Sequence, residues 1–333
     1  MLTGKDVCVV IPTYNRPDDL NKALSMIEAS TVLPERVFVI DQSKNDKSKI
    51  VCQSFKKLNV EYIHNPNPST GMSGNIGLIK ARKKFKLILT LDDDVEISKN
   101  YFLEALKIFN SNPKIIGVGG ADKSKNYDFS SAKSILSRFF FSLFFLPRKE
   151  DHKFRITGPY GNTESPIIKR DIADAEWLPG TNMFYRVCVY DDYLWPKIPG
   201  YNVLQDIECS YKVYREHGKG SLLITPKCRV YHSFSEVERY PERKRIFVSQ
   251  EDRFSFYYRF FNTPLGTLKM AWSITGLLLG NAARAIIRPS KKNFLHLKNV
   301  SEAIFYCLRY HKEIKAGKVR NFLNSDLSMK EKF

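Results

Sequence analysis

The sequence predicts an α/β protein with a mostly parallel sheet flanked by helices, followed by a basic and mainly helical C-terminal extension. Short apolar, β-branched runs alternate with amphipathic helical patterns over the first 120 residues, which is the order of βαβ units with right-handed crossovers. From Arg239 onward the chain has 19 basic and 7 acidic residues, so this stretch carries +12 of the total net charge of +18.

Length and composition set the scale of the molecule. The 333 residues, 43% of them hydrophobic and 26% charged, are enough to bury a full core and suit about two domains or one large domain with appendages. We expect one domain over residues 1–235, with a first half at 1–120, an insertion or lid at 121–175 and a second half at 176–235. Residues 236–333 form the expected tail.

Strands and helices alternate regularly at the start of the chain. Pro17 opens a helix that places Leu20, Leu24 and Ile27 on one face. The expected strands cover 6–12, 36–41, 60–63, 86–91 and 114–119, and the further helices cover 47–58, 71–85 and 98–110. This spacing predicts parallel strands that all end at one edge of a sheet.

The alternation is lost across residues 121–174. It returns at 177–186 and continues in a helix over 205–217, which Gly218 ends, and in two strands at 221–224 and 229–232. Beyond Pro241 the pattern is helical, basic and aromatic.

Three consecutive aspartates, Asp92, Asp93 and Asp94, follow the apolar run LILTL. Carboxylates at the end of a buried strand repel one another and lose solvation, so they need a cation or hydrogen-bond donors among them. An acidic cap on the following helix is the alternative, because Asp is favoured at helix N-termini.

Two other polar segments follow strands in the same way. Residues 13–16 come after the first expected strand, and Asp41 ends the second. In parallel sheets the ligand lies beyond the carboxyl ends of the strands. The sequence therefore predicts a site where these segments and the aspartates meet.

Four motifs in this order resemble the family 2 glycosyltransferases, inverting enzymes with the GT-A fold. They are VVIPTYNR at 9–16, VIDQS at 39–43, LDDDVEI at 91–97 and QDIECSYKVYREHG at 205–218, and the resemblance covers about residues 5–235. It implies transfer of a sugar from a nucleotide-sugar to a saccharide or lipid-linked saccharide hydroxyl, in cell-surface polysaccharide synthesis.

The resemblance also implies a donor site and a metal site. The expected contacts of the nucleotide-sugar are Thr13, Tyr14, Arg16, Asp41, Asp92 and Asp93. Asp94 and His232 are expected to hold Mn²⁺ or Mg²⁺, because an oxygen-bound divalent cation neutralises the departing diphosphate. Ordinary loop packing of Tyr14 and a structural role for His232 are the alternatives.

On the acceptor side, Asp206 matches the residue that acts as general base in the family. Helix capping is the alternative for this residue. Gly180, Thr181 and Asn182 resemble an acceptor-side loop, and Trp177 offers a ring to a sugar or packs in the core. Gln205, the residue directly before Asp206, is also expected on the acceptor side.

The sequence departs from the family pattern at Gln205, at Gly74 and, mildly, at Glu208, where Asp is common. Gln205 stands where many members have Glu, which removes one acceptor-side charge. Gly74 stands where many members have a basic residue before the Asn, here Asn75, and we expect Lys80 or Arg82 as its replacement at the diphosphate.

The basic tail predicts an anionic partner, and a phospholipid surface suits it better than nucleic acid, since no nucleic-acid-binding motif is found. Residues 134–147 and 270–287 are apolar segments interrupted by charge, which fits lying in a membrane interface; packing on the core is the alternative. Six cysteines without a CxxC motif fit reduced thiols. We therefore expect a cytoplasmic protein, peripheral on the membrane.

Two other classes of function stay open. A non-catalytic, membrane-associated nucleotide-sugar binder would fit Gln205 and Gly74. An aspartyl phosphotransferase would fit part of a DxDx(T/V) motif at 92–96, but Glu96 occupies its last position and the motif follows the fourth strand instead of the first.

Overall fold

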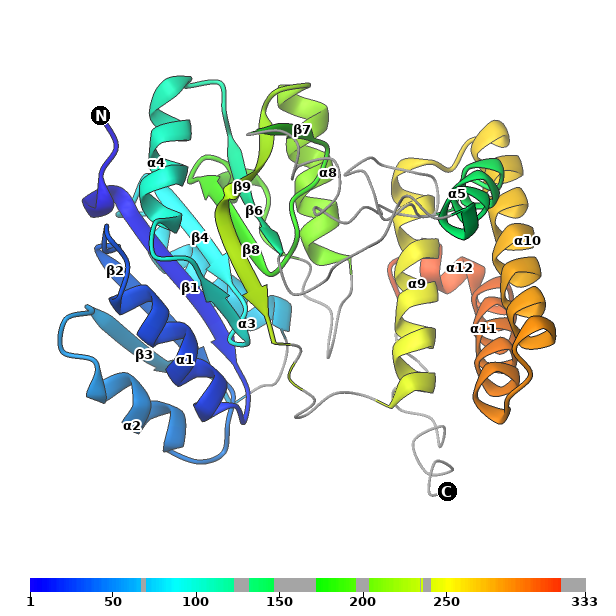
Figure 1. Cartoon of the computed structure of the whole chain (residues 1–333), viewed down its shortest axis with the longest axis horizontal. Coiled ribbons are helices and arrows are strands. Elements are labelled where there is room, and N and C mark those ends of the chain that lie inside the picture. The colour runs from blue at the N-terminus through cyan, green and yellow to red at the C-terminus, as the bar shows by residue number, and fades with distance from the viewer. Residues whose placement is uncertain are drawn as a thin grey trace.

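A mixed sheet forms the centre of the N-terminal part of the molecule (Figure 1). The computed structural model describes residues 1–66, 70–122, 132–146, 172–195, 204–233, 235 and 241–318. Among these residues the strand order is β3-β2-β1-β4-β8-β6-β9-β5, and β7 pairs with β9. The predicted α/β class is confirmed.

The first half of the sheet is entirely parallel. A short 3₁₀ turn (Gly4–Asp6) precedes it, and its strands are β1 (Val7–Thr13), β2 (Arg36–Asp41), β3 (Val60–His64) and β4 (Leu87–Leu91). The connecting helices are α1 (Pro17–Glu28), α2 (Lys47–Ser54) and α3 (Thr70–Ala81). β4 is buried at every residue, as expected for a strand covered by helices on both faces.

Antiparallel pairs enter in the second half. Its elements are β5 (Val95–Ile97), α4 (Tyr101–Ser111), β6 (Gly117–Asp122), β7 (Ala173–Ala175), β8 (Asn182–Arg186), α7 (Val189–Asp192), α8 (Gln205–His217) and β9 (Leu222–His232). β8 lies between β4 and β6 and runs antiparallel to both. The start of β8 is thereby placed beside the end of β4.

Three features differ from the sequence-based expectations. The two strands expected at 221–224 and 229–232 are one strand, β9, whose pairing with β6 shifts register between Thr225 and Val230, opposite Gly120 and Asp122. Residues 95–97 form β5 instead of leading straight into a helix. The segment 121–174 contains α5 (Ala132–Leu143).

Two apolar cores fix the sheet between its helices. One lies under α1 and α4 and includes Leu24 and Phe109. The other lies under α3 and α8 and includes Leu78 and Val213. Helices therefore cover both faces of the sheet and leave its carboxyl edge for the site.

The C-terminal helices pack beside this domain as a bundle (Figure 1). They are α9 (Glu242–Phe260), α10 (Pro264–Ile287), α11 (Lys291–Arg309) and α12 (His311–Lys315). The side chains of Thr263 and Ser290 accept hydrogen bonds at the N-termini of α10 and α11.

Helix α5 joins the bundle although almost a hundred residues separate it from the start of α9 in the chain. The rings of Phe144 and Trp272 stack with centroids 4.8 Å apart, and the Trp272 indole donates to the Leu143 carbonyl at 2.8 Å. Gly276 permits this approach, because a Cβ there would lie 2.2 Å from the Phe144 ring. The Phe-rich segment and α10 thus pack against each other.

All six cysteines lie in the described part of the chain as free thiols, and every one except Cys188 is buried.

Candidate active site

The ends of β1, β2 and β4 meet at one edge of the sheet. Thr13 and Asp41 are paired in register as the last residues of β1 and β2, and Asp92 directly follows β4. The structure therefore brings together the segments that the sequence places at a common rim.

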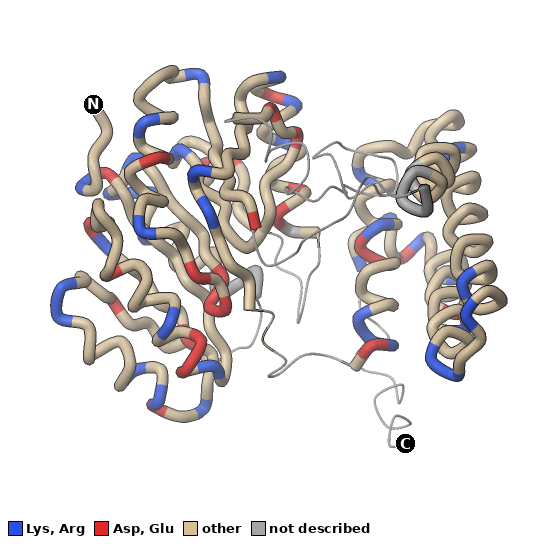
Figure 2. Tube along the Cα trace, viewed as in Figure 1, with Lys and Arg blue, Asp and Glu red and all other residues tan. Residues whose placement is uncertain are grey.

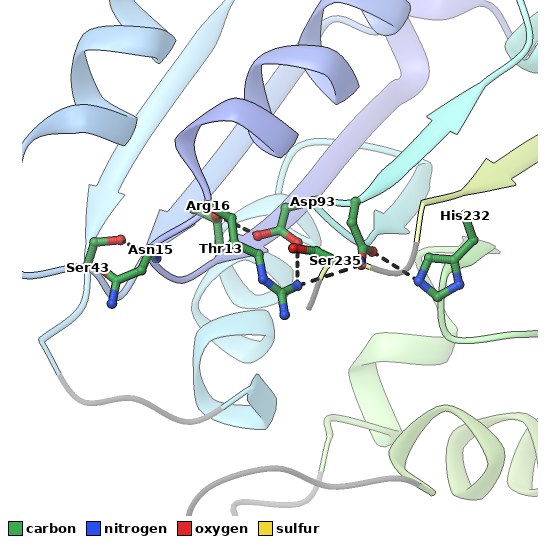
Figure 3. A network of polar contacts seen from close by, with 8 residues as sticks. Thr13, Asn15, Arg16, Ser43, Asp93, His232 and Ser235 are labelled. Atoms are coloured by element: carbon green, nitrogen blue, oxygen red, sulfur yellow. Dashed lines mark hydrogen bonds and ion pairs between the residues drawn. The ribbon is translucent and has the colours of Figure 1, made fainter. Parts of the chain in front are cut away.

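Asp93 ties the first loop to the acidic turn (Figure 3). Its Oδ2 accepts a hydrogen bond from Thr13 Oγ1 at 2.7 Å, and its Oδ1 lies 3.1 Å from Arg16 Nη1. Burial raises the pKa of Asp93 to about 6, although Arg16 and Thr13 favour the ionised form. Arg16 is thus held at the rim with its guanidinium facing the aspartates.

Asp94 is held from the opposite side by β9 and the loop after it. Val95 of β5 pairs with His232 of β9, which brings His232 Nε2 to 3.1 Å from Asp94 Oδ1. The Ser235 N–H donates to Asp94 Oδ2 at 2.9 Å. Burial alone raises the pKa of Asp94, but the contacts with His232, Ser235 and Arg16 hold it below its ordinary value.

Asp92, Asp94 and His232 can share one cation. One ligand atom from each lies within 4.8 Å of the others. Burial, together with the charge of Asp94, raises the pKa of Asp92 to about 7. Carboxylate oxygens with one imidazole nitrogen form a donor set that a divalent cation such as Mn²⁺ accepts, and such a cation would favour ionised Asp92. The residues present therefore fit the expected metal.

Asp41 is fully buried, and both of its carboxylate oxygens accept hydrogen bonds from neighbouring residues. Its Oδ1 accepts from the Ser43 N–H and hydroxyl, and its Oδ2 accepts from the Tyr62 hydroxyl at 2.9 Å. The Ser43 hydroxyl in turn accepts from the Asn15 N–H at 2.8 Å. The nucleotide contact at Asp41 stays a prediction, and its two hydrogen bonds position Ser43.

The sequence analysis did not single out Asn15, Ser43 or Tyr62. Asn15 has a positive φ of 54°, a conformation that Asn tolerates better than most residues, and this type preference was the available signal. Tyr14, beside it in the loop, is half-buried. No pattern in the sequence indicated Tyr62.

Asp206 stands at the second position of α8 and faces the loop before β8. Its Oδ2 accepts a hydrogen bond from the Gly180 N–H at 2.8 Å. Its Oδ1 is buried and has no hydrogen-bond partner among the described residues. Burial raises the pKa of Asp206 to about 6, even though backbone N–H groups stabilise the ionised form.

The loop at 180–181 links Asp206 to the acidic turn. A Cβ at Gly180 would lie 2.8 Å from Asp206 Oδ2, so glycine permits the close contact. The next residue, Thr181, accepts a hydrogen bond from the Asp92 N–H at 3.2 Å through its carbonyl. Two adjacent residues therefore connect the Asp206 carboxylate to the backbone of the acidic turn.

The remaining acceptor-side residues lie in different settings. Asn182 is fully buried, and its Oδ1 accepts from the Gly120 N–H and the Tyr101 hydroxyl. Trp177 is only 8% exposed and packs in an apolar cluster. Gln205 begins α8. Direct acceptor contacts by these three residues remain predictions, and a structural role of Asn182 and Trp177 is evident.

The structure accounts for the glycine at position 74. A Cβ there would lie 2.1 Å from the Trp195 ring, and Asn75 exchanges two 2.8 Å hydrogen bonds with the Trp195 backbone. A long basic side chain at position 74 would meet this ring. Lys80 and Arg82 are engaged elsewhere, with the Glu61 carboxylate at 2.7 Å and the Tyr190 carbonyl at 2.9 Å, respectively.

Comparison with known families gives one domain match. The family model described as Glycosyl transferase family 2 matches residues 8–173 of this chain. That range includes the first loop, the acidic turn and Asp41.

Two curated relatives share parts of the sequence. The O-antigen chain rhamnosyltransferase RfbN of Salmonella typhimurium is 22% identical over 143 residues, or 40% of this chain and 45% of the relative. The GalNAc(5)-diNAcBac-PP-undecaprenol beta-1,3-glucosyltransferase of Campylobacter jejuni is 33% identical over 93 residues, or 27% of this chain and 29% of the relative. The chain thus spans less than half the length of either relative.

Solved structures show the same fold over most of the chain. Staphylococcus aureus TarS 1-349 in complex with UDP-GlcNAc superposes with a TM-score of 0.56 at 16% identity, covering 94% of this chain and 84% of that one. The mannosyltransferase PcManGT from Pyrobaculum calidifontis, in complex with GDP-Man and Mn²⁺, gives a TM-score of 0.53 at 13% identity, covering 97% and 88%.

Proposed function

We propose that the chain is an inverting glycosyltransferase of family 2, because that family's model matches residues 8–173. It transfers a sugar from a nucleotide-diphosphate sugar to a hydroxyl of a saccharide or lipid-linked saccharide, in the synthesis of a cell-surface polysaccharide.

One observation carries this proposal. The loop at 180–181 holds Asp206 through the Gly180 N–H and holds the acidic turn through the Thr181 carbonyl. This link supports the proposal, because direct displacement at a sugar carbon requires a base held close to the groups that bind the diphosphate.

Asp206 supplies the general base. The lone pair of its buried Oδ1 accepts the proton of the acceptor hydroxyl as that oxygen attacks the anomeric carbon from the face opposite the diphosphate. The Gly180 N–H keeps the carboxylate in place through its other oxygen. Single displacement of this kind inverts the configuration of the sugar.

Asp92, Asp94 and His232 are the residues that would hold a divalent cation, and a bound cation supplies charge neutralisation for the departing diphosphate. Arg16, fixed by Asp93, adds a positive charge on the same rim. Thr13, Tyr14 and Asp41 belong to the loops that we assign to the nucleotide.

The donor class is supported by the bound ligands of the two similar structures, which are UDP-GlcNAc and GDP-Man with Mn²⁺. We assign this chain the shared chemistry, a nucleoside diphosphate joined to a sugar. The lipid-linked acceptor follows from the name of the Campylobacter relative.

The test is a screen of nucleotide-sugars for release of nucleoside diphosphate with Mn²⁺ and with saccharide acceptors. In the active combination, Asp206→Asn is expected to lower transfer by about two orders of magnitude or more. Calorimetry should show unchanged donor binding, because Asp206 is outside the donor-side cluster.

Asp18→Asn is the matched control, since Asp18 occupies the same second position of helix α1 and is exposed. Transfer at the native rate by Asp206→Asn would contradict the assignment. Donor binding without turnover by the native protein would favour the nucleotide-sugar binder. Phosphate release from simple phosphomonoesters would favour the phosphotransferase.

We further propose that the bundle attaches the enzyme to an anionic membrane on its cytoplasmic side. Helix α10 exposes apolar side chains that are 11 and 7 residues apart and so share one face of the helix, with Leu268, Leu279 and Ile286 exposed by 68%, 51% and 74%. By length and composition, among the described residues, α10 is also the one helix that could cross a membrane, which is weak evidence for crossing.

The positive charge of the bundle indicates which kind of surface binds the exposed apolar face of α10. Lys and Arg gather at the turn that joins α10 to α11 (Figure 2), at Arg284, Arg288, Lys291 and Lys292. Apolar side chains beside a basic cluster suit an interface with anionic phospholipid headgroups. Such attachment would hold the active site near a lipid-linked acceptor.

A further inference from the structure

Ser210 is a polar residue inside an apolar core. It lies one helical turn after Asp206 on α8 and is fully buried. Cys209 and Val213, close to it on the same helix, belong to the core that α8 covers. A buried hydroxyl costs free energy unless it forms hydrogen bonds, so the bonds of Ser210 indicate what this side chain does.

The Ser210 hydroxyl forms three hydrogen bonds, which use its one hydrogen and both of its lone pairs. It donates to the Asp206 carbonyl at 2.8 Å and accepts from the Leu178 N–H at 3.1 Å. The Tyr185 hydroxyl lies 2.7 Å from Ser210 Oγ. Because the Asp206 carbonyl takes the hydrogen of Ser210, the Tyr185 hydroxyl is the donor in the remaining pair.

These contacts close a ring around Asp206. Two residues after Leu178, the Gly180 N–H donates to Asp206 Oδ2 at 2.8 Å. Ser210 therefore joins the main chain of Asp206 to the loop, and the loop holds the carboxylate of the same residue. Pro179 lies between the two contacts and restricts the backbone of the loop. One short segment, 178–180, thus holds the base from both ends.

Tyr185 connects this ring to the central sheet. It is a fully buried residue of β8, and its ring lies over Gly117 of β6, where a Cβ would be 2.5 Å from a ring atom. The ring also packs edge to face against Tyr190, with centroids 6.1 Å apart. Burial raises the pKa of Tyr185 well above its ordinary range, so the hydroxyl keeps its hydrogen. The sheet thereby supplies a fixed donor to Ser210.

We propose that Ser210 is a positioning residue for transfer, which holds the Asp206 carboxylate toward the acceptor hydroxyl, and that Tyr185 holds Ser210 in place. The inference rests on the proposed function, in which Asp206 is the base. Without the Ser210 hydroxyl, the Leu178 N–H and the Tyr185 hydroxyl lose their acceptor, and the loop that holds the carboxylate is released. Misplacing a catalytic group by about 1 Å can lower a rate about a hundredfold.

The first experiment measures transfer by Ser210→Ala in the active combination of donor and acceptor. We expect kcat to fall about tenfold to a hundredfold, with both KM values within about twofold of the native ones, because the change acts through the base. Ser48→Ala is the matched control, since Ser48 is fully buried on α2 and its hydroxyl has no hydrogen-bond partner in the described part of the chain. A native kcat in Ser210→Ala would overturn the proposal.

A double-mutant cycle separates positioning of the base from general damage to the fold. Asp206→Asn has no base to position, so adding Ser210→Ala should lower its residual transfer rate by less than about twofold. An equal proportional loss in the native and Asp206→Asn backgrounds would show that Ser210 acts on something other than Asp206.

Tyr185→Phe provides a milder variant, because it removes one hydroxyl and leaves the buried ring. Ser210 keeps its bonds to Asp206 and Leu178 in this variant, so kcat should fall only about threefold to tenfold. An unchanged kcat would show that Tyr185 has no part in holding Ser210.

Hydrogen exchange tests the ring of contacts without turnover. The Leu178 and Gly180 amides should exchange about tenfold faster in Ser210→Ala than in the native protein or Ser48→Ala, because their hydrogen bonds are lost or weakened. Unchanged exchange at both amides would overturn the link between Ser210 and the loop. Faster exchange, together with no release of nucleoside diphosphate by the native protein, would instead refute the glycosyltransferase.

Discussion

At the scale of single residues, Asp206 sets the expected pH dependence of transfer. Burial raises its pKa to about 6 from an ordinary value of 3.8, and a general base acts only when ionised. The transfer rate should therefore fall as the pH drops through about 6, two units higher than for an exposed aspartate, and level off above.

The measurement is kcat/KM for the acceptor between pH 4.5 and 9, with Mn²⁺ and donor held saturating. The residual transfer rate of Asp206→Asn should not show the fall below about pH 6 that is expected of the native protein. An acid limb near 4 in the native protein, or an unchanged limb in Asp206→Asn, would assign the titration to another group.

Gly74 offers a second prediction at this scale. Replacing a helical glycine by alanine ordinarily stabilises a helix by up to about 1 kcal/mol, but the Cβ at position 74 would meet the Trp195 ring at 2.1 Å. We expect Gly74→Ala to lower the free energy of unfolding by about 1–3 kcal/mol, as for overpacked cores.

Chemical denaturation of a double-mutant cycle isolates the cause. In a Trp195→Ala background the added methyl has space, so Gly74→Ala should become neutral or stabilising. The same loss of stability in both backgrounds would show that the Trp195 ring is not responsible.

At the scale of elements, the pairing of β5 with β9 places His232 on the metal side. His232→Ala is expected to weaken Mn²⁺ binding in the presence of nucleoside diphosphate by about tenfold or more, since one of three converging ligands is lost. Titration calorimetry measures the change. His217→Ala, an exposed histidine at the end of α8, is the control, and equal Mn²⁺ affinity of the native protein and His232→Ala would remove His232 from the site.

The elements also show what the sequence can predict. The first four strands were predicted within about two residues, because each is a continuous apolar run bounded by polar turns. Their order along the chain was enough to bring Thr13, Asp41 and Asp92 to one edge.

Other elements carry no comparable local signal. β5 has only three residues, and its partner on β9 is more than 130 positions away, so its formation depends on a contact that no window of sequence contains. For the same reason, the hydrogen bond between the Gly180 N–H and Asp206 could not be predicted from the sequence. Pairing of Arg16 with Asp93 likewise depends on how two loops fold together.

At the scale of the whole molecule, charge and exposed apolar surface are concentrated in the C-terminal bundle. We expect the protein to co-sediment with vesicles containing anionic phosphatidylglycerol at low salt, and to dissociate as salt shortens the screening length to about 10 Å at 0.1 M. Vesicles of neutral phosphatidylcholine should retain much less protein.

The variant Leu268→Glu/Leu279→Glu tests the apolar stripe of α10. It is expected to reduce vesicle binding about tenfold or more, because two side chains no longer enter the interface. Ile50→Glu on α2, at a position that is 65% exposed, is the control. Failure of the native protein to bind anionic vesicles at low salt would refute membrane attachment.

The packing of α5 on α10 has a consequence for synthesis on the ribosome. Phe144 emerges long before Trp272, and at 5–20 residues per second the interval lasts about 6–25 s. During this time the aromatic face of α5 lacks its partner helix, so the nascent chain depends on chaperones or on the membrane itself to shield it. A ribosome-bound chain ending before α9 should accordingly be captured by chaperones more strongly than one that includes α10.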